Sequence, residues 1–247
     1  MIRTMISRTS PYSSTNDTAG DEITTMDADR VLERYEEHVS AVDSEFSRVY
    51  QVFAERMQCR RGCSMCCSQT FSISLLEAAY ISRAVKAMPE TERTRLRAAA
   101  RKYVAAAKTL LAGVESDESE AITPRPGVRL PCPALDGDAC SIYGARPIIC
   151  RKWGIPIFNP RKPAELQACE LNFKPGEAVD MEGILEPQIA LLEEWVELKG
   201  LAQRTLKHRQ ATTTVAEAIL SDFEEVLARG ESDGRAPNGQ PQGGREV

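Results

Sequence analysis

Four of the chain's eight cysteines lie within nine residues, and this run constrains the fold more than any other feature of the sequence. The run holds Cys59, Cys63, Cys66 and Cys67, and the other four are Cys132, Cys140, Cys150 and Cys169. Only two histidines accompany them, His38 and His208. Any metal or redox chemistry is therefore expected to be mainly sulfur chemistry.

No secretory signal is expected before this run, because residues 1–26 contain basic side chains but no apolar stretch. The thiols are therefore expected to stay reduced in the cytoplasm, and clustered reduced thiols usually bind a metal or take part in catalysis. A disulfide framework would need an oxidising compartment, and it is the competing interpretation.

Composition divides the chain into one helical domain with polar ends. Residues 1–26 and 230–247 are low in apolar side chains and are predicted to be a disordered leader and a disordered tail. Met1 and Met26 are both candidates for the start of the protein. Residues 27–229 are predicted to form a single helical cysteine-cluster domain, and the apolar content of the whole chain, 42%, is enough for a sizeable core.

Apolar periodicity predicts helices over much of this domain, so the expected fold class is mostly α. Capping boxes at Ser74–Glu77 and Thr214–Glu217 predict two of the helix starts. The predicted helices cover residues 27–57, 75–88, 89–111, 187–206 and 215–229. The last is expected to run unbroken until Gly230. In the third, the expected apolar face consists of Leu96, Tyr103, Val104, Ala107 and Leu110.

Residues 130–174 follow no helical or strand period, are rich in Pro and Gly, and hold the last four cysteines. Long irregular connections are uncommon in compact domains unless something holds them. A metal site joining this segment to the first cysteine run would supply that constraint, because ligation offsets the entropy of ordering the loops. Within the segment, Gly137 predicts a tight turn that brings Cys132 and Cys140 together, and Pro147 predicts a short helix that presents Cys150.

The spacing of the first run suits more than one kind of metal centre. Cys59, Cys63 and Cys66 share one face if the helix continues, and a knuckle at the helix end would also gather them. Cys66 and Cys67 are adjacent and are not expected to chelate one mononuclear ion together. Eight cysteines therefore allow two four-thiolate zinc sites, or one iron–sulfur cluster with thiols to spare.

Several basic residues neighbour the cysteines in the sequence, namely Arg60, Arg61, Arg146, Arg151 and Lys152. Cations near the sulfurs would lower thiol pKa values and offset the charge of about −2 that four thiolates leave on a zinc ion. The alternative is a solvated basic surface. Tyr143 and Trp153 are expected either to shield the site from water or to pack in the core. His38 and His208 are expected at the surface.

Charge and hydropathy exclude two classes of partner. The chain has 31 Lys and Arg against 36 Asp and Glu, a net charge of −5, whereas a nucleic-acid-binding protein usually needs a basic face. Its apolar stretches are only a few residues long, far short of the ~20 that span a membrane. We therefore expect a cytoplasmic protein that binds neither nucleic acid nor membrane, with an unidentified protein as the remaining class of partner.

Several ordered motifs resemble one known family. The run from Cys59 to Cys67 is followed by Leu130-Pro-Cys132-Pro, by Cys140-Ser-Ile-Tyr143 and by Arg146-Pro-x-x-Cys150-Arg151. Over residues 55–170 this order resembles the YkgJ-type cysteine-cluster family, described as a zinc- or iron-chelating domain and including the flagellin lysine methylase FliB. The resemblance implies that all eight cysteines, Cys169 included, are metal or iron–sulfur ligands, with zinc or iron as the cofactor.

The sequence thus favours a zinc- or iron-chelating cysteine-cluster protein of unproven activity. The alternative that FliB implies is an iron–sulfur enzyme, or enzyme subunit, in S-adenosylmethionine-linked protein methylation. Cys59-x3-Cys63-x2-Cys66 has the spacing of radical S-adenosylmethionine enzymes, but the sequence lacks the strand–helix alternation of their barrel. It also lacks a glycine-rich dinucleotide loop. The sequence identifies no catalytic residue, and whether the chain is an enzyme stays open.

Overall fold

The computed structural model describes residues 28–60, 62–110, 129–158, 167–174, 177, 179–206 and 212–229. The predicted leader (1–26) and tail (230–247), together with Arg61 and His208, lie outside the described residues. The described part is mostly α, which confirms the predicted fold class. None of its helices is both long enough and apolar enough to cross a membrane.

The described elements are mainly helices with a few very short strands. The helices are α1 (Ala28–Val52), α2 (Leu75–Lys86), α3 (Glu90–Leu110), α4 (Ile148–Lys152), α5 (Leu185–Leu206), α6 (Val215–Leu220) and α7 (Phe223–Arg229). β1 (Ile73–Ser74) pairs antiparallel with β4 (Thr212–Thr213), and β2 (Leu135–Asp136) pairs antiparallel with β3 (Ala139–Cys140). Short 3₁₀ turns cover Met65–Ser68 and Tyr143–Ala145.

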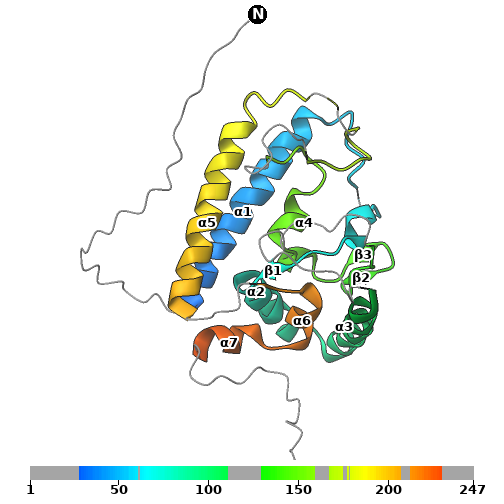
Figure 1. Ribbon diagram of the computed structural model, residues 1–247, viewed down its shortest axis with the longest axis vertical. Coiled ribbons are helices and arrows are strands. Elements are labelled where there is room, and N and C mark those ends of the chain that lie inside the picture. Colours follow the sequence, from blue (N-terminus) through cyan, green and yellow to red (C-terminus); the bar gives the residue numbers. More distant parts are fainter. Residues whose placement is uncertain are drawn as a thin grey trace, which may run out of the picture.

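The two long helices α1 and α5 lie side by side and run in opposite directions (Figure 1). The apolar stripe of α1 faces inward, and Tyr35 is its central residue. The Tyr35 ring meets Tyr80 of α2 edge-on at a centroid distance of 5.1 Å and Trp195 of α5 at 5.7 Å. The main core therefore joins α1, α2 and α5, and it continues to α6 and to the irregular segment.

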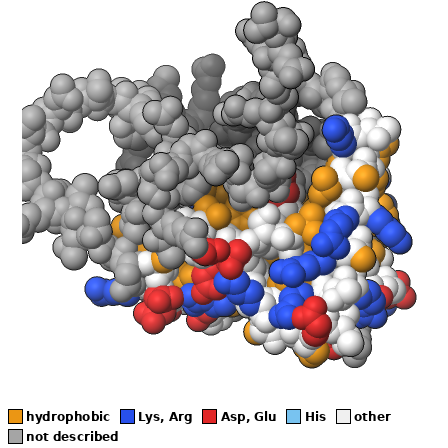
Figure 2. Space-filling model, turned by 90° about the horizontal axis from the view of Figure 1, so that it is seen from below, with side chains coloured by type: hydrophobic (Ala, Val, Ile, Leu, Met, Phe, Trp, Pro, Cys, Tyr) orange, Lys and Arg blue, Asp and Glu red, His pale blue; other side chains and the backbone are white. Residues whose placement is uncertain are grey.

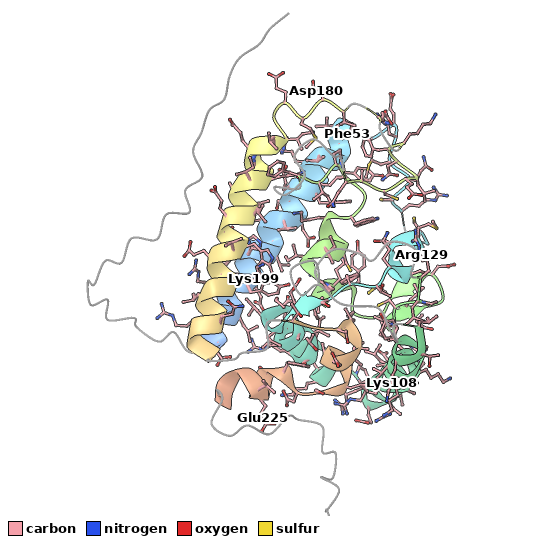
Figure 3. The ribbon with its side chains drawn as sticks, in the orientation of Figure 1. Phe53, Lys108, Arg129, Asp180, Lys199 and Glu225 are labelled. Carbon is pink, nitrogen blue, oxygen red and sulfur yellow. The ribbon has the colours of Figure 1, made fainter. Side chains whose placement is uncertain are left out.

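A smaller apolar cluster, which we call the second core, lies at the C-terminal end of α1. Its buried members are Val49, Met57, Ile155, Phe173 and Ile184. Phe53 packs edge-on against Phe173 with ring centroids 5.2 Å apart. Figure 3 shows Phe53 near the end of the α1–α5 pair where Asp180 also lies. Ile155 and Phe173 belong to the irregular segment, so this cluster holds that segment at two places. Cys59 packs against the same cluster.

The last predicted helix is wrong in one respect, because it is two helices, α6 and α7, separated at Ser221 and Asp222. The backbone at Ser221 is extended, with φ −114° and ψ 160°. Ser82 of α2 explains the break. Its hydroxyl lies 2.8 Å and 3.0 Å from the Ala218 and Ser221 carbonyl oxygens, and it accepts a hydrogen bond from the Phe223 N–H. The buried hydroxyl of Ser82, which comes from α2, thus takes the place of the backbone hydrogen bonds that would have continued α6 into α7.

The third predicted helix is confirmed as α3, but most of its predicted apolar face is not buried. Leu96 and Ala100 are the buried residues of α3, whereas Val104 is 39% and Leu110 is 52% exposed. The reason is that α3 packs mainly against α6, a helix of only six residues, which covers a short part of it.

Figure 2 shows basic and acidic side chains close together on the lower face of the molecule.

The predicted surface position of His38 is also wrong. Its side chain is 1% exposed, and the ring stacks on Trp195 at a centroid distance of 5.7 Å. Nδ1 lies 2.9 Å from the Glu194 carboxylate. The helix pair explains this, because α5 supplies both the ring that covers the imidazole and the acceptor that satisfies it.

Candidate metal centre

All eight cysteines are free thiols, and their surroundings divide them into two groups. The first group is Cys59, Cys63 and Cys169, and the second group is Cys67, Cys132, Cys140 and Cys150. Within each group the thiols act on one another electrostatically. Cys66 interacts with members of both groups. The following contacts show how the fold produces this division.

Backbone pairing joins the first cysteine run to the irregular segment at Cys67. The Cys132 N–H donates to the Cys67 carbonyl oxygen at 2.7 Å, and the Leu130 N–H donates to the Ser68 carbonyl oxygen at 2.8 Å. Gln69 and Arg129 form an antiparallel bridge one step further on. Figure 3 shows Arg129 beside the 3₁₀ turn that carries Cys67. Two segments more than sixty positions apart are thereby held in register.

The β2–β3 hairpin brings Cys140 back toward Cys132, as the turn signal predicts. Gly137 has a φ of +59°, the left-handed conformation that such a turn requires. Leu135 pairs with Cys140, and the Leu135 N–H donates to the Cys132 carbonyl oxygen at 3.0 Å. Cys132 and Cys140 both pack against the main core.

The short helix α4 follows Pro147, as predicted, and carries Cys150. Two buried groups fix this helix. The Ile148 N–H donates to Oε1 of Glu77 on α2 at 3.0 Å. The Arg151 guanidinium, 2% exposed, binds the Asp43 carboxylate of α1 at 2.5 Å. The position of Cys150 is therefore set by α1 and α2 together.

Asn172 organises the first group. Its side-chain oxygen accepts the Gln58 N–H at 2.8 Å, and its Nδ2 lies 2.7 Å from the Gly154 carbonyl oxygen and 3.4 Å from the Cys59 sulfur. Its backbone N–H donates to the Cys169 carbonyl oxygen at 2.9 Å. One buried amide thus connects the segments of Cys59 and Cys169 with the turn after α4.

Gly154 provides the space that the Cys59 sulfur occupies. Its φ of +118° lies in the region that favours glycine, and a Cβ atom at this position would lie 2.5 Å from Cys59 Sγ. Any other residue type would strain this backbone conformation and displace either the sulfur or the turn. The backbone after α4 is therefore shaped around a cysteine of the first run.

Burial is the main cause that raises the thiol pKa values of three members of the second group, to about 12 for Cys132, above the ordinary value for Cys140 and well above it for Cys150. Neighbouring sulfurs add to the rise, because thiolates gathered in a buried place repel one another. A bound cation would remove that penalty. Deprotonation of Cys132, Cys140 and Cys150 would therefore be favoured by a bound metal ion.

Cys66 and Cys67 share a hydrogen bond between their thiols. This bond lowers the pKa of Cys67 to about 7 and, together with burial, raises the pKa of Cys66. Its lowered pKa makes the Cys67 thiolate accessible near neutral pH.

The predicted basic surroundings are present only in part. Burial raises the pKa of Cys140, and the Arg146 guanidinium partly offsets that rise. Arg151 is paired with Asp43, and Arg60 is exposed and bonds to Gln58. Burial lowers the pKa of Lys152.

The expectation that Tyr143 shields the sulfurs is wrong. Tyr143 is 65% exposed, and the Arg146 guanidinium lies over its ring, 3.9 Å from the ring centroid. Tyr143 begins the 3₁₀ turn Tyr143–Ala145 between β3 and α4, and its exposure means that the alternative expectation, packing in the core, is also wrong.

The donor set fits zinc or iron by its chemistry. Soft thiolate ligands select these metals. As the described structure stands, no three Cys, His, Asp or Glu side chains are close enough together to hold an ion. Backbone hydrogen bonds thus hold cysteine-bearing segments next to one another, whereas the described sulfur atoms do not surround a shared metal position.

Fold and site together define a helical protein whose cysteines lie in one run and one irregular segment. Residues 58–169, somewhat less than half of the chain, match the model of the CxxCxxCC family, described as a "Putative zinc- or iron-chelating domain". The match confirms the family that the motifs predict and gives no support to the methylation alternative. No curated protein and no solved structure matches the chain.

Proposed function

We propose that the chain holds two four-thiolate metal centres, which fasten the irregular segment to the helical scaffold. The ligands of the first centre are Cys59, Cys63, Cys66 and Cys169. The ligands of the second centre are Cys67, Cys132, Cys140 and Cys150. The proposed function of both centres is structural, and the proposed metal is zinc.

The observation that carries this proposal is that three of the cysteines pack on two different apolar clusters. Cys59 packs on the second core, whereas Cys132 and Cys140 pack on the main core. A zinc ion binds sulfurs at about 2.3 Å, so one ion cannot serve both places. Four ligands complete a tetrahedral site, which assigns Cys66 to the first centre and its neighbour Cys67 to the second.

Metal binding would draw the sulfurs together by small side-chain movements. A cysteine sulfur turns about one torsion, χ1, while its backbone stays in place. The hydrogen bonds at Cys67, Cys132 and Cys169 support this, because they already hold the backbone segments of each group next to one another. Ligation then contributes folding free energy, which the irregular segment lacks by itself.

A structural role follows from closed ligand sets. Four cysteines around one ion leave no open position for water or substrate, which is the arrangement of structural zinc sites. We keep a cytoplasmic location as part of the proposal, because reduced thiols persist there. A protein is the class of partner that we propose, with the metal centres stabilising the surface it would bind.

Two cysteine variants test the proposal. Cys63→Ser is expected to remove the ion of the first centre and Cys150→Ser that of the second, so each variant should keep about one zinc ion where the wild type holds about two. Both should unfold at lower denaturant concentration, because each lost ion removes folding free energy. Elemental analysis of the purified full-length chain, with labile sulfide measured on the same sample, gives the counts.

Ser141→Ala is the matched control, because Ser141 is an exposed neighbour of Cys140. It should keep both ions and the wild-type unfolding transition. Iron with stoichiometric sulfide would replace the zinc assignment by iron–sulfur clusters. Loss of all metal in each single cysteine variant would contradict two separate centres.

A further inference from the structure

Helix α3 concentrates positive charge in a chain that is acidic as a whole. Its 21 residues hold six basic side chains and two acidic ones, whereas the net charge of the chain is −5. Both acids, Glu90 and Glu92, lie in the first turn, so from Arg93 to its end the helix carries only cations. A local excess of one charge favours a partner surface of the opposite charge.

Three of these cations share one face of the helix. Arg97, Arg101 and Lys108 follow one another at steps of four and seven residues, and Val104 lies between the last two. Residues at such spacings lie on the same side of an α-helix. We call the set Arg97, Arg101, Val104 and Lys108 the basic stripe. Like charges four residues apart on a helix repel one another, so the stripe is unfavourable for α3 by itself.

No described carboxylate compensates this repulsion by a direct ion pair. Arg101 and Lys108 are exposed, and neither they nor Arg97 form an ion pair with a residue that the structure describes. The Nε of Arg97 is buried and has no hydrogen-bond partner in the described part of the chain. By contrast, Arg95 on another side of α3 pairs with Asp136 at 2.8 Å. The cations of the basic stripe are therefore available to a partner.

Helix α3 lies at the edge of the molecule. Figure 1 draws it at the lower right, away from α1 and α5, and Figure 3 places Lys108 there. It packs mainly against the short helix α6, and Val104 stays 39% exposed. An apolar side chain between cations gives a partner a surface to bury as well as charges to pair with.

We propose that the basic stripe binds an acidic segment of a partner protein, with carboxylates opposite the three cations and an apolar side chain over Val104. The charge complementarity and the exposed valine carry this inference. It takes the class of partner from the proposed function and rests on it to that extent, but it requires no metal ligand.

Two other classes of negatively charged partner fit the basic stripe less well. A net charge of −5 opposes the approach of a nucleic acid, whose binding depends on the attraction of its phosphates. A helix that lies in a membrane surface needs large apolar side chains on one face. Six residues of α3 are alanines, which bury little area in lipid.

Charge reversal on the basic stripe and beside it tests the inference. The probe is a fluorescent helical peptide that carries the complementary pattern Glu-x3-Glu-x2-Leu-x3-Glu, and fluorescence anisotropy measures its affinity for the full-length chain. Arg101→Glu should weaken binding at least about tenfold. Lys102→Glu is the matched control, because it makes the same charge change one residue on, on a different side of α3. It should change the affinity by less than about twofold in physiological salt.

Val104→Ser separates apolar contact from attraction between charges. It leaves the charge of the stripe unchanged and should weaken peptide binding by about threefold, because it removes apolar area from the contact. A scrambled peptide of the same composition should bind at least about tenfold more weakly than the matched one. Equal weakening by Arg101→Glu and Lys102→Glu, or equal affinity for both peptides, would overturn the inference.

Further measurements decide between occupants of the basic stripe. Duplex DNA or phosphatidylserine vesicles that bound more tightly than the peptide, and lost binding in Arg101→Glu, would replace the protein partner by a nucleic acid or a membrane. Self-association that Arg101→Glu abolishes would assign the stripe to a second copy of the chain. A large gain in peptide affinity when the four acids of residues 115–120 become amides would assign it to that segment. Each of these results contradicts the proposal.

Zinc content and the midpoint of urea unfolding, measured on the same samples, separate this inference from the metal centres. Arg101 is exposed, so Arg101→Glu should keep both wild-type values. If the wild type holds no zinc but the peptide results are as expected, the metal centres are wrong and the basic stripe stands. If it holds about two zinc ions and the peptides are not distinguished, the basic stripe is wrong and the metal centres stand.

Discussion

Replacing Gly154 by alanine is expected to release the metal of the first centre and to lower the free energy of unfolding by about 3 kcal/mol. The new Cβ would lie 2.5 Å from the Cys59 sulfur, and the backbone there has a φ of +118°. Either the turn after α4 or the sulfur must move, and Asn172 couples both to the Cys169 segment. Urea unfolding and zinc content of the purified variant measure the two effects.

Gly183→Ala is the control for this experiment. Gly183 also has a left-handed backbone, with φ +69°, but no atom lies within 4 Å of a Cβ added there. This variant should therefore show the backbone strain alone, about 1 kcal/mol, and keep both ions. Equal loss of stability and equal zinc content in the two variants would mean that the space beside Cys59 is irrelevant to the site.

The second large effect is expected at Glu77. Glu77→Ala should lower the free energy of unfolding by about 3–5 kcal/mol, because it leaves the buried N–H groups of Ser74 and Ile148 without an acceptor. It should also lower zinc content, since the Ile148 contact fixes the helix that carries Cys150. Thermal unfolding and elemental analysis of the same sample give both numbers.

Glu217 offers a closely matched control. It closes the second capping box, where its Oε2 lies 2.7–3.1 Å from Thr213 Oγ1, Thr214 N and Thr214 Oγ1, but no bond to α4 is recorded for it among the described contacts. Glu217→Ala should therefore cost about 1–2 kcal/mol and leave the zinc content unchanged. If the two variants lost the same amount of zinc, the link between α2 and α4 would not position the second centre.

Local patterns predicted much of the helical framework, because each depends on neighbours within a few positions. The stripe of α1 and the capping boxes of α2 and α6 are set by residues three or four apart, and the structure confirms them. The Gly137 turn and the start of α4 after Pro147 are local in the same way. The sequence therefore sufficed wherever a segment determines its own conformation.

Errors arose where a distant segment decides the outcome. The break between α6 and α7 depends on Ser82, more than 130 positions away. The burial of His38 depends on α5. In each case a buried polar group finds its partner only in three dimensions, so no local periodicity can reveal it.

The same distinction holds at the site. The cysteines could be named from their clustering, but their division into two groups could not. Glu77, Asp43 and Asn172, which connect the cysteine-bearing segments, have no sequence signal that separates them from other polar residues of a helix or loop. Glu77 was identifiable as a capping residue, whereas its bond to α4 was not.

X-ray absorption at the metal edge, on full-length chain whose metal and protein are quantified together, tests the central claim most directly. The account predicts about two zinc ions per chain, each surrounded by four sulfurs at about 2.3 Å and by no nitrogen or oxygen. A single ion per chain, or a shell that includes oxygen or nitrogen ligands, would contradict two closed four-thiolate centres.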